Sequence, residues 1–138
     1  MKRIICFVLC MYVFSACSSE PVPTDPMDYV GMYEYKTAHL LNHVSGSGDY
    51  IATNHDGDCL ILKPSGEYIF LQGGTTKAMS ETRGQWRLTS LEYPNTSRIS
   101  LDSHGYPIRV KEGKIRLLVN DDLGVWYEKF SDSIPLEE

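Results

Sequence analysis

The chain of 138 residues lacks an apolar run long enough to stay in a bilayer as a helix. A permanent span needs roughly 20 apolar residues, whereas the N-terminal apolar run covers only residues 4–16. Basic residues are also few, since 13 Lys and Arg oppose 18 Asp and Glu and give a formal charge of -5. Nucleic-acid affinity comes largely from Lys and Arg at phosphates, so we expect no nucleic-acid partner.

The sequence also lacks the motifs of common catalytic sites. It contains no Gly-Xaa-Ser-Xaa-Gly elbow, no phosphate-binding loop and no dinucleotide fingerprint. We therefore expect a protein that is not an enzyme, with no catalytic residue and no cofactor. With 42% hydrophobic and 22% charged residues, the composition is that of one ordinary folded domain.

The first residues have the layout of a secretory signal. Lys2 and Arg3 precede the apolar run, which ends at Phe14, Ser15, Ala16 and Cys17. These four residues resemble the lipobox of bacterial lipoprotein precursors, with Phe14 in place of the usual Leu. The resemblance implies that residues 1–16 are removed, that Cys17 is acylated, and that the membrane is a partner through this lipid. Ser18 after the Cys implies, by the same resemblance, the periplasmic face of the outer membrane; the alternative is a soluble secreted protein.

The segment after Cys17 is rich in proline. Residues 17–28 have little to bury and predict an extended tether, followed by one domain over residues 29–138. Loss of Lys2 and Arg3 with the signal moves the formal charge from -5 to -7.

After processing and acylation, Cys59 is the one cysteine left with a free thiol. It begins an apolar run, Cys59 to Leu62, so we expect it to be buried as a small hydrophobe. The alternative, a nucleophile assisted by His55, requires a positive setting that lowers the thiol pKa, and Asp56 and Asp58 act in the opposite direction.

Short alternating runs between Gly, Pro, Asn and Asp clusters predict an all-β domain. The expected strands, about eight, form a small antiparallel up-and-down barrel; they cover residues 31–36, 58–63, 67–72, 84–89, 98–102, 107–111, 114–119 and 125–130. Residues 38–44 favour one short helix and residues 50–53 a further strand. The run Tyr68 to Leu71 is apolar at every position, which predicts a strand that is buried on both sides or covered by a loop. Trp86 and Trp126 are expected to anchor the core.

Gly31, Met32 and Tyr33 open the first expected strand. This resembles the calycin architecture of lipocalin-type barrels, whose first strand carries Gly, any residue and Trp, with Tyr33 in the place of the Trp. The resemblance implies the barrel fold, and a barrel of this size holds either side chains or one small ligand.

We expect no metal site. The cluster from Asn54 to Cys59 lacks the spacing of a calcium loop and reads as a turn, and His39 and His43 have no acidic residue between them. Adjacent Asp121 and Asp122 are expected to be solvated.

The irregular connections, residues 37–54 and 73–83, are the expected recognition surface. Tyr50 is the candidate aromatic anchor, with Asp49 and Asp56 supplying negative charge nearby. Together these features predict a lipid-anchored binding module that recognises an envelope protein or a toxin, as an inhibitor or immunity-type protein. The alternative is a lipocalin-like carrier or sensor of a small apolar ligand.

Overall fold

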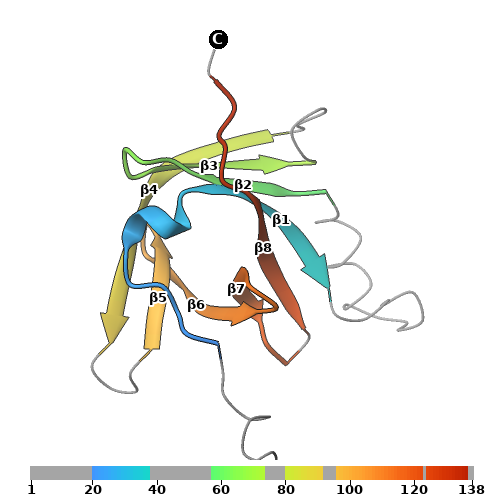
Figure 1. Ribbon diagram of the computed structural model, residues 1–138. Coiled ribbons are helices and arrows are strands. Elements are labelled where there is room, and N and C mark those ends of the chain that lie inside the picture. Colours follow the sequence, from blue (N-terminus) through green and yellow to red (C-terminus); the bar gives the residue numbers. More distant parts are fainter. Residues whose placement is uncertain (1–19, 38–56, 74–79, 92–95, 123, 137–138) are drawn as a thin grey trace, which may run out of the picture.

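The computed structural model describes residues 20–37, 57–73, 80–91, 96–122 and 124–136. These residues form one short 3-10 helix and eight antiparallel strands, which confirms the predicted all-β fold (Figure 1). The elements are η2 (Pro26–Tyr29), β1 (Gly31–Thr37), β2 (Cys59–Leu62), β3 (Glu67–Gln72), β4 (Ser80–Leu91), β5 (Thr96–Leu101), β6 (His104–Lys111), β7 (Lys114–Asn120) and β8 (Val125–Ser131).

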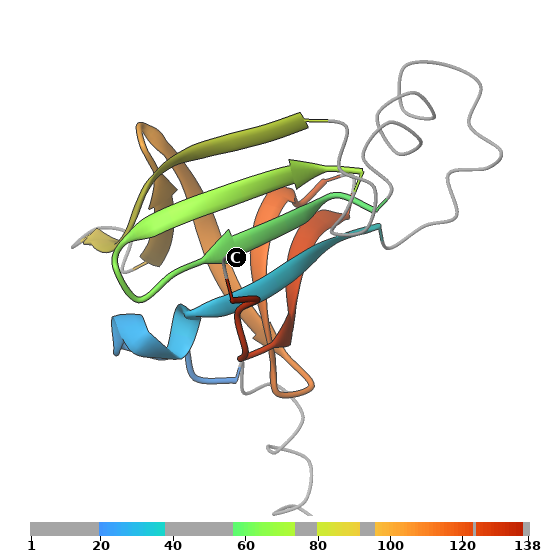
Figure 2. The ribbon, with the colours of Figure 1, turned by 90° about the horizontal axis from the view of Figure 1, so that it is seen from above.

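The sheet closes into a barrel because β8 pairs with β1. All the remaining pairs join strands that are consecutive in the sequence. This is the up-and-down order that the short turns predict. We call the end that carries the β1–β2, β3–β4 and β7–β8 connections the loop end. The opposite end, the η2 end, carries η2 and the β2–β3 and β6–β7 turns (Figure 2).

Aromatic side chains from several strands meet in the barrel interior around Tyr127 of β8. The ring of Tyr127 makes edge contacts with Tyr35, Phe70 and Tyr106, at centroid distances of 5.7, 6.3 and 6.4 Å. Tyr35 is the register partner of Tyr127 in the β1–β8 pair. Phe70 of β3 and Tyr106 of β6 come from strands that do not pair with β8, so their contacts cross the interior. Such edge-to-face pairs add to the stabilisation from burial.

The strands β1 to β3 are apolar on the outer face as well. Met32, Ile61 and Ile69 lie opposite one another in register, and they form a second buried cluster with Cys59. Ile134 of the C-terminal segment packs against this cluster. The expectation that β3 is buried on both sides is therefore confirmed.

The two tryptophans occupy different environments. Trp86 is buried in the core, and its indole N–H donates to the Lys63 carbonyl at 2.8 Å. Trp126 lies on the outer face instead, because alternation along β8 directs Val125 and Tyr127 inward. The prediction that Trp126 anchors the core is wrong.

The N-terminal segment closes the η2 end. Asp25 caps η2 by accepting from the Met27 N–H at 2.9 Å. Tyr29 is fully buried and donates to the Pro23 carbonyl at 2.6 Å, and Tyr33 donates to the Tyr29 carbonyl at 2.7 Å. Burial is the main reason that the pKa of Tyr29 rises to about 12. Part of the expected tether over residues 17–28 therefore packs on the barrel.

Candidate functional site

The residues predicted to contact partners or lipid lie outside the described ranges. This applies to Tyr50, Asp49 and Asp56, and to Cys17. His39 and His43, for which no metal site is expected, and His55, the alternative helper of the Cys59 thiol, lie outside these ranges as well. The expected helix at 38–44 and strand at 50–53 lie there too. The structure does describe the strand ends from which the two irregular connections begin and to which they return.

Asp58 joins the bases of these two connections at the loop end. Its side chain is fully buried, and its carboxylate accepts from the Gly73 N–H at 2.9 Å. Its backbone carbonyl accepts from the Tyr35 N–H at 3.1 Å. Asp58 precedes β2 and Gly73 follows β3, so one side chain holds the start of the β3–β4 connection against the end of the β1–β2 connection. The sequence pattern places Asp58 where the expected turn Asn54 to Cys59 meets the expected strand 58–63, and it carries no signal for this partner.

Tyr35 lies close to Asp58 on the inner face of the barrel. Burial is the main reason that the pKa of Tyr35 is raised, and the negative charge of Asp58 adds to it. Tyr35 also contacts Tyr127. The Asp58 carboxylate therefore lies near the aromatic side chains of the barrel interior.

Cys59 is 4% exposed and belongs to the outer apolar cluster. Burial raises the pKa of its thiol to about 11, and the charge of Glu34 acts in the same direction. The thiol is therefore uncharged at neutral pH, and the prediction that it is buried is confirmed.

A groove of about 420 Å³ lies on the outer wall of β6 to β8. Arg116 stacks over the Trp126 ring, 4.2 Å from its centroid, and its Nε donates to Glu128 at 3.1 Å. Arg109 donates twice to the Asp121 carboxylate, at 2.9 and 3.0 Å. Asp121 is thus exposed as predicted but also paired, and the two arginines here have acidic partners.

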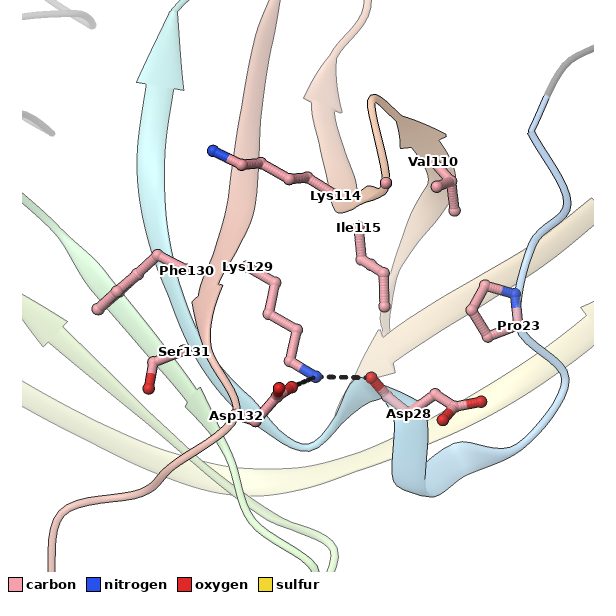
Figure 3. Close-up of a pocket in the computed structure, with 10 residues that line it drawn as sticks. Pro23, Asp28, Val110, Lys114, Ile115, Lys129, Phe130, Ser131 and Asp132 are labelled. Carbon is pink, nitrogen blue, oxygen red and sulfur yellow. Dashed lines mark hydrogen bonds and ion pairs between the residues drawn. The ribbon is translucent and has the colours of Figure 1, made fainter.

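A hollow of about 530 Å³ opens at the η2 end (Figure 3). Its lining combines apolar and charged side chains, namely Pro23, Val110, Ile115, Phe130, Asp28, Lys114, Lys129 and Asp132. The Lys129 ammonium donates to the Asp28 carbonyl at 2.7 Å and pairs with Asp132 at 2.6 Å. This contact lowers the pKa of the Asp132 carboxyl. We refer to this feature as the η2-end hollow.

No metal site emerges from the described part of the chain, where no three His, Cys, Asp or Glu side chains converge. Within the same residues, no helix has the length and apolarity to cross a membrane. Neither a protein-family model, nor a curated protein, nor a solved structure matches the chain.

Proposed function

We propose that this protein is a lipid-anchored binding module of the bacterial envelope that recognises another protein through its loop end. Acylation at Cys17 anchors it, at the periplasmic face of the outer membrane. The partner is an envelope protein or an envelope-directed toxin, and the module acts as an inhibitor or immunity-type protein. The lipobox-like run Phe14 to Cys17 supports the anchor.

The single observation that carries the recognition surface is the Asp58–Gly73 hydrogen bond. It holds the end of the β1–β2 connection, which contains Tyr50, Asp49 and Asp56, beside the start of the β3–β4 connection. A rigid base beneath variable loops is a common arrangement for recognition, because the scaffold positions the loops.

The charge of the processed chain supports a basic partner. Its formal charge of -7 favours rapid encounter with a positively charged protein and makes the rate depend on salt. Tyr50 would supply the aromatic contact, and Asp49 and Asp56 the negative charge around it.

A second candidate, a carrier or sensor of a small apolar ligand, draws support from the η2-end hollow. Its volume of about 530 Å³ falls in the range of small-molecule sites. The aromatic contacts around Tyr127 favour the first candidate, because they place side chains where a ligand at the barrel centre would lie.

The anchor is tested by expressing the full chain in a Gram-negative host with an alkyne fatty acid. Acyl labelling and membrane fractionation are expected to be lost in Cys17→Ala and retained in the control Cys59→Ser. Labelling that survives in Cys17→Ala would overturn the anchor.

The recognition surface is tested with a photo-crosslinking residue at Tyr50 and, as a control at the opposite end, at Glu112. Discrete adducts are expected from position 50 alone, with a yield that falls in high salt. Adducts equally abundant from both positions, or none from position 50, would overturn recognition through the loop end. Saturable binding of a fluorescent fatty acid to the same protein would favour the second candidate, a carrier or sensor of a small apolar ligand.

A further inference from the structure

We propose that the η2 end of the barrel rests on the bilayer surface, with Phe130 and Met27 in the headgroup layer. This rests on the acylation of Cys17 proposed above. It adds a second interaction surface, whose partner is the lipid headgroup layer itself, and it fixes the direction in which the loop end points.

The first argument is the length of chain between the acylated residue and the barrel. The Glu20 carboxylate accepts from the Gly113 N–H in the β6–β7 turn at 2.9 Å. Cys17 is three residues before Glu20, and three residues span at most about 11 Å. The headgroup layer of one leaflet is about 5 to 8 Å thick, so an acylated Cys17 keeps the β6–β7 turn beside the headgroups.

The residues after Glu20 add no spacer. Val22 packs against the core, and Pro23 accepts the hydrogen bond of buried Tyr29. The part of the expected tether from Glu20 onward is therefore held on the barrel and does not lift the domain from the membrane.

The second argument is the presence of exposed apolar side chains at this end. Phe130 is 51% exposed and lines the η2-end hollow, and Met27 of η2 is 56% exposed. Phe130 is the extra residue in an irregularity of the β1–β8 pairing, where Met32 faces Ser131 and Tyr33 faces Lys129. Such bulges redirect side chains at barrel rims. Because the lipid anchor holds these groups at high local concentration, even weak apolar contacts suffice for docking.

Charge decides which lipid surface fits. Of the charged side chains that line the hollow, Asp28 and Asp132 balance Lys114 and Lys129. Glu20, whose carboxylate accepts from the N–H of the lining residue Gly113, adds one further negative charge. Lys129 is already paired with Asp132. A negatively charged surface repels this excess of carboxylates, so the partner is a zwitterionic headgroup layer.

Docking in this way sets the orientation of the recognition surface. Strand β8 runs from Val125 at the loop end to Ser131 at the η2 end, a length of about 20 Å at 3.3 Å per residue. The loop end therefore faces away from the bilayer, where a partner in the periplasm reaches it.

The test uses the acylated full chain in phosphatidylcholine vesicles that contain a headgroup-nitroxide lipid. In a Cys59→Ser background, a fluorophore is attached at Lys111→Cys, beside the β6–β7 turn, or, as the matched control at the loop end, at Asp122→Cys. Quenching is expected to be several-fold stronger at position 111 than at position 122. Equal quenching at the two positions in protein that floats with the vesicles would overturn the docking.

A second set of variants separates the docking face from the anchor. With the fluorophore at Lys111→Cys, the double change Met27→Asp and Phe130→Asp is expected to abolish quenching while flotation is retained. The control Val119→Asp, at an apolar residue 43% exposed near the loop end, is expected to leave quenching unchanged. Quenching that survives the double change would overturn the apolar docking face.

Vesicles of different lipid composition distinguish a zwitterionic from a negatively charged headgroup layer as the partner. Replacing a third of the phosphatidylcholine by phosphatidylglycerol is expected to reduce quenching at position 111, and an increase would contradict the zwitterionic assignment. A chain that fails to float overturns the acylation, and with it both proposals. A chain that floats without quenching at position 111 overturns the docking alone.

Discussion

The hydroxyl of Tyr68 donates a 2.8 Å hydrogen bond to the carboxylate of Asp102, 34 residues further along the chain. The second carboxylate oxygen accepts from the Gln85 N–H at 3.0 Å, and the Asp102 N–H donates to the Gln85 carbonyl at 2.8 Å. One turn residue thereby ties the β5–β6 connection to β3 and β4. Asp102 has a left-handed backbone with φ of 52°, which Asp and Asn tolerate better than other side chains.

Replacing Asp102 by Asn is expected to lower the melting temperature most at neutral pH. The hydrogen bonds from Gln85 and Tyr68 hold the pKa of the Asp102 carboxyl below its ordinary value. Its stabilisation is therefore complete above the ordinary aspartate pKa, near 4, and is lost as the pH falls through the lowered pKa of the folded state. Melting curves of parent and Asp102→Asn from pH 7 to pH 2 should converge at acid pH. A constant gap over this range would contradict the account, and Asp122→Asn serves as the exposed control.

Gly84→Ala is expected to destabilise the barrel by about 1 to 3 kcal/mol, the usual cost of overpacking. A Cβ at this position would come well inside 3.0 Å of both the Asp102 carboxylate and the Tyr68 ring. Chemical denaturation measures the loss. In the double variant Gly84→Ala with Asp102→Ala, the carboxylate is gone, so the cost of the added methyl group should shrink; an unchanged cost would contradict the steric explanation.

The two tryptophans should respond differently to truncation. Trp86→Ala is expected to cost about 3 to 5 kcal/mol because it empties core volume and also leaves the Lys63 carbonyl without its indole donor. Trp126→Ala removes an outer-wall ring whose cation–π contact with Arg116 contributes on the order of 1 kcal/mol. Denaturant titrations of both variants should show this order, and equal losses would contradict it.

Periodicity predicted the strands well because alternation and turn residues are local signals. Size alone favours a core position for Trp126, whereas the alternation of Val125, Tyr127 and Glu128 already fixes the inner and outer faces of β8. The prolines of residues 17–28 favour an extended segment, and they outweigh the cap signal of Asp25 before Pro26, where the 3-10 helix begins. Strand β4 extends beyond the predicted 84–89 because its first half pairs with β3 and its second half with β5.

The contacts of the candidate site are harder to predict from the sequence than the strands are. The composition of the two irregular connections indicates that they are loops. The hydrogen bond between Asp58 and Gly73 joins their ends across 15 residues of sequence. Local patterns carry no information about such a pairing, and the same holds for Glu20 and Gly113, which are 93 residues apart.

Cys59 is expected to resist a bulky maleimide in the native protein at pH 7 and to react quickly after denaturation. The thiol is buried, and its pKa of about 11 leaves on the order of one molecule in 10,000 as thiolate at this pH. Mass spectrometry of the labelled chain measures the rate, with Phe130→Cys as the exposed control. Native labelling of Cys59 as fast as that of the control would contradict burial.

Asp58→Ala is expected to destabilise the loop end, because the Gly73 N–H loses the carboxylate that accepts its hydrogen bond. An unsatisfied group in a buried setting costs about 1 to 3 kcal/mol. Asp58→Asn retains a side-chain oxygen acceptor in nearly the same shape, so it should restore most of the loss. Hydrogen exchange at the Gly73 amide reports the bond directly and should accelerate in Asp58→Ala but not in Asp58→Asn. If the Asp58–Gly73 bond positions the connections for recognition, crosslinking from position 50 should fall and recover in the same order. Unchanged protection of the Gly73 amide in Asp58→Ala would remove Asp58 from this role.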